Sequence, residues 1–137
     1  MCFMTMGSLN EDVEARLRLA DEMLNDAKSF LRDGHLKSAA DRAYYSMFHA
    51  AQAALANEGM KPPRTHSGLR SQFARHFVRA GIVEREFSKH LTLAQEMREK
   101  STYEVYADIS RGSTEELVDN AEAFVQRIKA LVGEERL

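Results

Sequence analysis

Apolar residues recur every three or four positions along almost the whole chain, and few residues interrupt the pattern. This spacing gathers apolar side chains on one face of an α-helix, whereas a half-buried strand needs alternation at every second residue. The chain has only seven glycines and two prolines, and the prolines are adjacent, at Pro62 and Pro63. The sequence therefore predicts an all-α fold, an antiparallel up-and-down bundle of four to five helices.

Glycines and capping residues indicate where these helices begin and end. Asn10 is a typical N-cap residue, and Gly34 is typical of the position that ends a helix. Thr65 or Ser67 is expected to cap a third helix, and Ser113 with a glutamate three residues later forms a capping box. Eight alanines within residues 39–56 let neighbouring helices approach closely, so we expect the second helix to be the most buried. The expected helices span 10–33, 35–57, 65–81, 82–100 and 113–132.

Length and composition place the chain in a broad class of protein. Its 137 residues suit one domain, which we expect over 10–132, with a disordered N-terminal tail at 1–9 and a frayed C-terminus at 133–137. The one cysteine, Cys2, excludes a disulfide framework and a cysteine-based zinc site. There is no apolar run long enough for a membrane span or a signal peptide, so we expect a cytoplasmic protein.

One segment of the chain is strongly basic although the net charge is only −2. Residues 59–83 carry five lysine and arginine residues and no carboxylate, in a chain with 21 acidic residues. Such a segment can receive an anionic partner. The alternative is a solvated face that meets acidic residues of the same chain or of a second subunit.

Three stretches of sequence carry a resemblance to a known family. They are SAADRAYYSMFHAA at 38–51, THSGL at 65–69 and AQEMREKSTY at 94–103. Their order and spacing resembles the HEPN superfamily, and within it the small stand-alone branch of prokaryotic proteins, over residues 10–132. The resemblance implies a helical bundle that forms a homodimer. It also implies a metal-independent RNase, often a toxin, with a nucleotidyltransferase as antitoxin or partner.

The resemblance also implies a catalytic signature, an arginine followed after four to six residues by a histidine. At the corresponding place Arg98 is followed by Tyr103, so the sequence favours a protein without this RNase activity. Other pairs have the right spacing but lie elsewhere, and chance alone predicts on the order of one such pair. They are Arg42 with His49, Arg70 with His76, and Arg85 with His90.

Arg98 and Tyr103 remain the candidates for a catalytic or ligand-binding role, with Tyr106 beside them. Arginine offers a planar, permanently charged donor fork to phosphate. Tyrosine, with a pKa near ~10, is a poor base at pH 7 but can bind a phosphate or stack on a nucleotide base. In the alternative interpretation Arg98 fixes the loop after the fourth helix, and the two tyrosines cover the end of the bundle.

Two further groups of residues are candidates for binding an anion. Arg42, Tyr45 and His49 share one face of the second helix, although Arg42 could instead pair with a carboxylate and His49 be a half-buried structural histidine. His66 begins the third helix, where free N–H groups favour phosphate, or it anchors the loop. Its basic neighbours in the sequence are Arg64 and Arg70. The five histidines lack metal-binding spacing, so we expect no metal and no cofactor.

Three functions follow from these observations. The first is a dimeric HEPN-type module that binds RNA, a nucleotide or a partner nucleotidyltransferase, in the manner of a toxin–antitoxin system. The second is a metal-independent RNase toxin that uses Arg98 with a tyrosine, or with a histidine that the fold brings close. The third is a purely structural interaction protein. A histidine near Arg98 in space would favour the second function.

Overall fold

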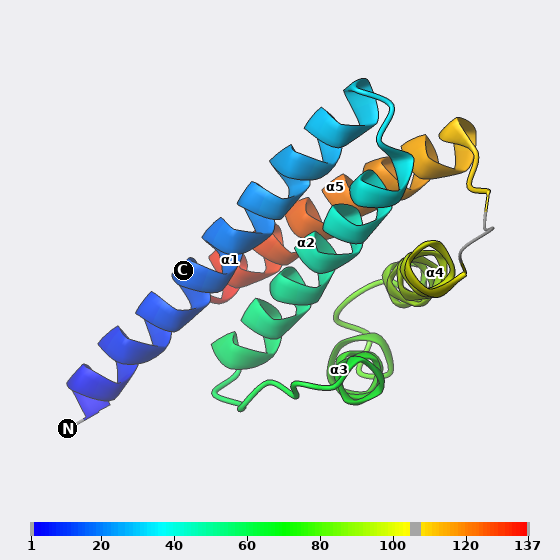
Figure 1. The fold of residues 1–137 in the computed structure, drawn as a ribbon. Helices are drawn as coiled ribbons and strands as arrows, with labels where there is room; N and C mark the ends of the chain where they lie inside the picture. The colour runs from blue at the N-terminus through cyan, green and yellow to red at the C-terminus, as the bar shows by residue number, and fades with distance from the viewer. Residues whose placement is uncertain (1, 105–107, 137) are drawn as a thin grey trace.

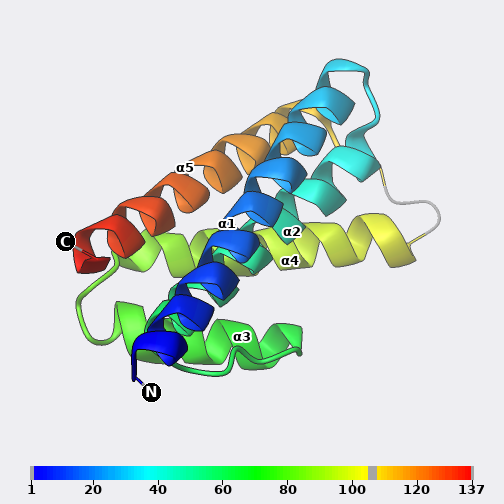
Figure 2. The same cartoon turned by 90° about the vertical axis from the view of Figure 1, so that its left-hand side faces the viewer.

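The computed structural model describes residues 2–104 and 108–136, and side chains within 10–104 and 108–133. The predicted all-α bundle is confirmed, because these residues form helices and no strand. α1, α2 and α5 lie side by side with α1 antiparallel to the other two, while α3 and α4 run across them (Figures 1 and 2). The elements are α1 (Cys2–Arg32), α2 (Leu36–Asn57), α3 (His66–Phe73), a π-helical turn η1 (Ala74–Val78), α4 (Arg85–Tyr103) and α5 (Arg111–Arg136).

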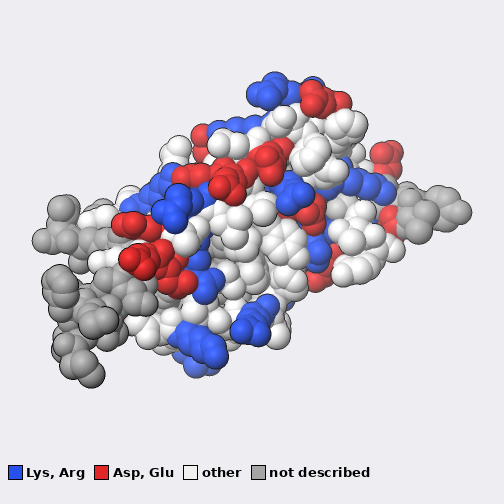
Figure 3. Space-filling model, turned by 60° about the vertical axis from the view of Figure 1, so that its left-hand side comes forward, with Lys and Arg blue, Asp and Glu red and all other residues white. Residues whose placement is uncertain are grey.

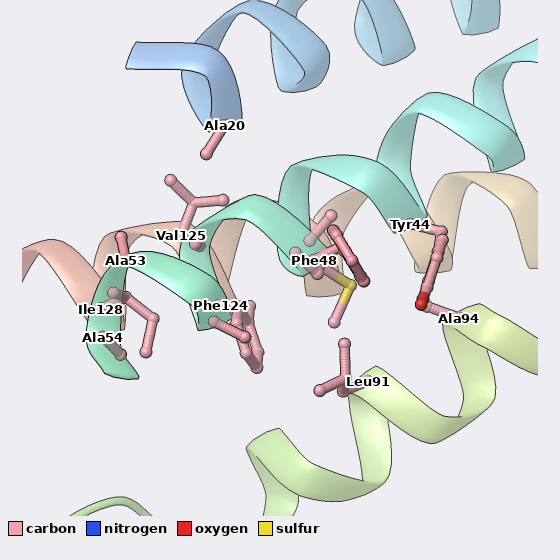
Figure 4. Close-up of a cluster of buried hydrophobic side chains, with 14 of the residues drawn as sticks. Ala20, Tyr44, Phe48, Ala53, Ala54, Leu91, Ala94, Phe124, Val125 and Ile128 are labelled. Atoms are coloured by element: carbon pink, nitrogen blue, oxygen red, sulfur yellow. The ribbon is translucent and has the colours of Figure 1, made fainter. Parts of the chain in front are cut away.

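α2 is the centre of the bundle, as its alanine content predicts. It contacts all four other helices, and 14 of its 22 residues are buried. Because alanine has a short side chain, residues such as Ala53 and Ala54 let large side chains of neighbouring helices pack close to the α2 backbone. Figure 4 shows Phe124 of α5 and Leu91 of α4 in this cluster, with Tyr44 extending from α2 towards α4.

Several helix ends differ from those predicted. α1 begins at Cys2 instead of Asn10, and α5 continues to Arg136 instead of ending at 132. The segments at both ends contain no proline, and one glycine in a helix costs only about 1 kcal/mol, so nothing there stops the helix. α1 therefore includes residues 2–9, where a tail was predicted, and α5 includes residues 133–136.

The cap of α5 lies one turn earlier than the sequence pattern indicated. The backbone N–H of Ser113 donates to the side-chain oxygen of Ser110 at 3.1 Å, so Ser110 caps the helix and Ser113 lies inside its first turn. α3 ends at Phe73 and is followed by η1 to Val78 instead of continuing to 81, and α4 spans Arg85–Tyr103 instead of 82–100. Two other predicted ends are confirmed. Thr65 accepts a hydrogen bond from the backbone of Gly68 as the cap of α3, and Gly34 follows α1 with a positive φ of 79°.

Candidate functional site

The Thr-His-Ser-Gly block builds the first turn of α3 and fixes the position of His66. The Thr65 Oγ1 atom accepts a hydrogen bond from the backbone N–H of Gly68 at 3.1 Å. A Cβ atom added to Gly68 would lie 2.6 Å from this oxygen and 3.2 Å from the Cβ of Pro63. Only glycine fits here, so the threonine and the glycine are structural residues that hold the histidine between them.

We expect Gly68→Ala to destabilise the protein by about 1–3 kcal/mol, because the new methyl group must displace the cap of α3 or the loop at Pro63. Urea unfolding monitored by circular dichroism measures this change. Gly112→Ala is the matched control, since a Cβ there meets no atom within 4 Å. A Gly68→Ala protein as stable as the wild type would contradict this account of the block.

His66 is joined to the buried Tyr44 of α2, and this contact fixes its tautomer. The Tyr44 hydroxyl lies 2.5 Å from His66 Nδ1. Burial raises the pKa of Tyr44 far above its usual range, so the phenol keeps its proton. Among the hydrogen bonds of the described residues, His66 Nδ1 is the only acceptor for that proton. Neutral His66 therefore carries its own hydrogen on Nε2 and presents a donor there.

His66 is neutral at pH 7. Burial lowers the pKa of His66 below its usual value, and the nearby cations Arg98 and Arg70 lower it further, against the opposing charge of Glu99. The imidazole can then donate a hydrogen bond to an anion without adding a positive charge to the site.

Arg98 of α4 is held in place by two residues of α2. Its guanidinium carbon lies 5.1 Å from the centre of the Tyr45 ring, within the range of a cation–π contact. Its Nε atom donates to Asp41 at 3.2 Å, and the arginine side chain is 15% exposed. Burial alone lowers the pKa of Arg98, but the hydrogen bond to Asp41 and the nearby tyrosines raise it overall, so the charge is retained. Arg98 thus fixes a contact between α2 and α4.

The other predicted site residues differ in how they are placed relative to Arg98 and His66. Tyr45 and His66 pack ring to ring at 6.2 Å, and the ring centres of His49 and Tyr45 are also 6.2 Å apart. Arg70 of α3 has a buried Nε atom that forms no hydrogen bond within the described part of the chain. Tyr103 is 72% exposed, so it does not cover the end of the bundle.

Two predicted residues, Arg42 and Arg64, lie outside the cluster around Arg98 and His66. Arg42 contacts the sulfur of Met23 at 3.4 Å, and among the described ion pairs it has no carboxylate partner. Arg64 is exposed on the loop before α3. Tyr106 lies outside the described residues. Sequence reasoning missed Asp41, whose signal was its position four residues before Tyr45 on the same face of α2, and it did not name Tyr44 as a site candidate.

The surface near α3 carries the basic segment. At the bottom of the view in Figure 3, lysine and arginine side chains stand without acidic ones beside them, as the composition of residues 59–83 predicts. Within 2–104 and 108–136, no helix is long and apolar enough to cross a membrane. In the same ranges no three His, Cys, Asp or Glu residues gather as a metal-binding group.

The fold and the site define a class of protein, an all-α bundle with an arginine, a histidine and tyrosines converging where three helices meet. A family model described as HEPN domain matches residues 13–131. Two proteins named UPF0332 protein are similar to the chain. The one from Pyrococcus horikoshii is 45% identical over 60% of this chain and 57% of its own length. The one from Archaeoglobus fulgidus is 32% identical over 92% of this chain and 99% of its own length.

A protein of Methanocaldococcus jannaschii with the name "Putative toxin" is 30% identical over 92% of this chain and 92% of its own length. The family model covers most of the chain, and two of these relatives match almost all of it. The chain belongs to the HEPN domain family, in the group named UPF0332.

Proposed function

We propose that the protein is a dimeric HEPN module that binds RNA or a nucleotide where α2, α3 and α4 meet. The observation that carries this proposal is the placement of Arg98, stacked on Tyr45 and held by Asp41 beside neutral His66. The bond to Asp41 uses only Nε, so the terminal nitrogens of Arg98 remain available to a phosphate. The exposed ring of Tyr103 offers a surface on which a base can stack.

A metal-independent RNase is the second candidate, because the fold brings a histidine against the same tyrosine that Arg98 covers. RNA cleavage of this kind needs a base for the 2′-hydroxyl proton and a cation for the developing charge. His66 Nε2 carries a hydrogen, and His66 Nδ1 accepts from Tyr44. Acting as the base would require the other tautomer, in which Nδ1 carries the hydrogen and the Tyr44 hydroxyl no longer donates to it. We therefore favour binding over cleavage.

Binding and cleavage are separated by one set of measurements on the purified protein. Fluorescence anisotropy with a labelled 12-nucleotide single-stranded RNA, and calorimetry with AMP, measure affinity at 50 mM and 200 mM salt. We expect RNA affinity to fall about tenfold or more over this range, as for a few phosphate contacts, and the RNA to stay intact. Robust cleavage would favour the RNase, and no binding of either ligand would favour a structural interaction protein.

The wider context we propose is a toxin–antitoxin-like system with a nucleotidyltransferase as partner. Two supports exist for this context. Relatives from Methanocaldococcus jannaschii carry the name "Putative toxin", and HEPN domains commonly pair with nucleotidyltransferases. Co-purification of such an enzyme from the native host, or its gene beside this one, tests the proposal.

The proposed homodimer interface is centred on Leu93 of α4. Leu93 is 56% exposed and lies between two hollows of about 470 Å³ each. One hollow is lined by Arg79, Arg85 and Lys89. The other is lined by three acidic residues and one lysine. A two-fold axis through Leu93 would place the basic side of one copy on the acidic side of the other.

We expect Leu93→Asp to convert a dimer into a monomer, because it buries a charge at the centre of this face. Light scattering at micromolar concentration measures the mass, which should fall from about twice 15.5 kDa to that value. Ile82→Asp, at an exposed apolar residue 41% accessible, is the matched control and should leave the dimer intact. A wild-type monomer, or a Leu93→Asp dimer, would contradict this face.

A further inference from the structure

A polar hollow adjoins the Arg98 site at the beginning of α2. It has a volume of about 220 Å³. Asp41 belongs to its wall and also binds Arg98 at 3.2 Å, so one ion pair separates the hollow from the tyrosine–histidine cluster. The lining residues are Phe30, Lys37, Ser38, Asp41, Arg42, Ser101 and Thr102.

The charges around the hollow favour an anion. Lys37 and Arg42 contribute two cations, and neither forms an ion pair with a carboxylate within the described part of the chain. Among the contacts of the described residues, Arg42 has a polar contact to the sulfur of Met23 at 3.4 Å, and a thioether is a weak acceptor. The single acid in the wall, Asp41, already has Arg98 as its counter-ion.

Three hydroxyl groups complete the wall. Ser38 lies in the first turn of α2, while Ser101 and Thr102 lie in the last turn of α4. The Ser101 hydroxyl donates to the backbone oxygen of Arg98 at 3.0 Å. Ser101 therefore links the hollow to Arg98, the central residue of the neighbouring candidate site. Two cations and the hydroxyl groups of Ser38 and Thr102 around a small hollow have the chemistry that recognises a phosphate group.

We propose that this hollow is a second phosphate subsite, so that the ligand of the protein is a single-stranded oligonucleotide and not a mononucleotide. The inference rests on the proposed function of the Arg98 site. Lys37 and Tyr45 are eight residues apart on α2, or about 12 Å along the helix axis. Nucleic acid advances roughly 3.4 Å per nucleotide along a helical strand, so the two subsites together span a few nucleotides.

The test compares a double variant, Lys37→Ala with Arg42→Ala, against the wild type with two probes. With the 12-nucleotide RNA we expect at least a fivefold loss of affinity at 50 mM salt, and a salt slope smaller by about 1.4, as for two lost phosphate contacts on a single strand. With AMP we expect a change of less than twofold. Arg98→Ala should weaken the binding of both probes.

Two further variants keep the experiment interpretable. The control is Arg18→Ala with Lys129→Ala, which removes two exposed cations from other parts of the surface and should leave the RNA slope unchanged. If the double variant loses its helical circular dichroism, Lys37→Glu replaces it. Lys37 is exposed, so this substitution reverses one charge without touching the core.

Each outcome separates the two proposals. RNA binding with the wild-type slope in the double variant would overturn the second subsite and leave the Arg98 site standing. An equal loss of AMP and RNA affinity would also overturn it, because the hollow would then be part of one mononucleotide site. Failure of the wild type to bind either probe would overturn the proposed function, and the inference with it.

Discussion

Arg98→Ala is expected to weaken RNA binding by about 10- to 100-fold while the helical content stays unchanged. A hydrogen bond to a charged group contributes about 1.5–3 kcal/mol, and removing the guanidinium also leaves the carboxylate of Asp41 next to the ligand without its counter-ion. The remaining negative charge then repels phosphate. Anisotropy titrations measure the affinity, and circular dichroism confirms the fold.

Arg98→Lys separates the charge of this residue from its geometry. Lysine keeps the positive charge but loses the planar fork and the stacking on Tyr45, so we expect an affinity between those of the wild type and Arg98→Ala. Arg18→Ala, an exposed arginine on α1, is the control for the loss of one surface charge. An Arg98→Ala protein that binds RNA as tightly as this control would refute the proposed site.

Phe124→Ala is expected to lower the free energy of unfolding by about 3–5 kcal/mol, which is a large part of the roughly 5–15 kcal/mol that stabilises a domain. Phe124 is fully buried, and its ring lies 5.3 Å from Phe73 of α3 and 6.2 Å from Phe87 of α4. Its removal leaves a cavity between α5 and the two helices that carry His66 and Arg98. Chemical denaturation measures the loss.

Phe124→Leu is the matched variant for this cavity. Leucine keeps much of the buried volume, so we expect a loss of no more than about 1.5 kcal/mol. The difference between the two variants reports the packing at this position. Equal stabilities of Phe124→Ala and the wild type would show that α3 and α4 are held against the bundle by other contacts.

Periodicity and composition alone predict most of the fold. The spacing of apolar residues gives the five helices, and the alanines of residues 39–56 predict that α2 lies at the centre, which its burial confirms. Helix ends are less certain, because neighbouring residues compete to cap the same turn. Ser110 and Ser113 are both good caps, and the hydrogen bond from the Ser113 backbone N–H shows that Ser110 is the one used.

The geometry of the candidate site could be predicted only in part, because sequence spacing indicates which residues share a helix face but not which faces meet. Tyr45 and His66 were recognised as candidates, yet the bond between Tyr44 and His66 joins residues 22 positions apart. Arg98 and its partner Asp41 are 57 positions apart. These residue pairs come into contact only because α3 and α4 cross α2. That crossing is set by the large side chains packed between the helices, Phe73 and Phe124 among them. The sequence by itself therefore determined the helices and the candidate residues, whereas the tertiary packing decided that an arginine, a histidine and a pair of tyrosines form one site.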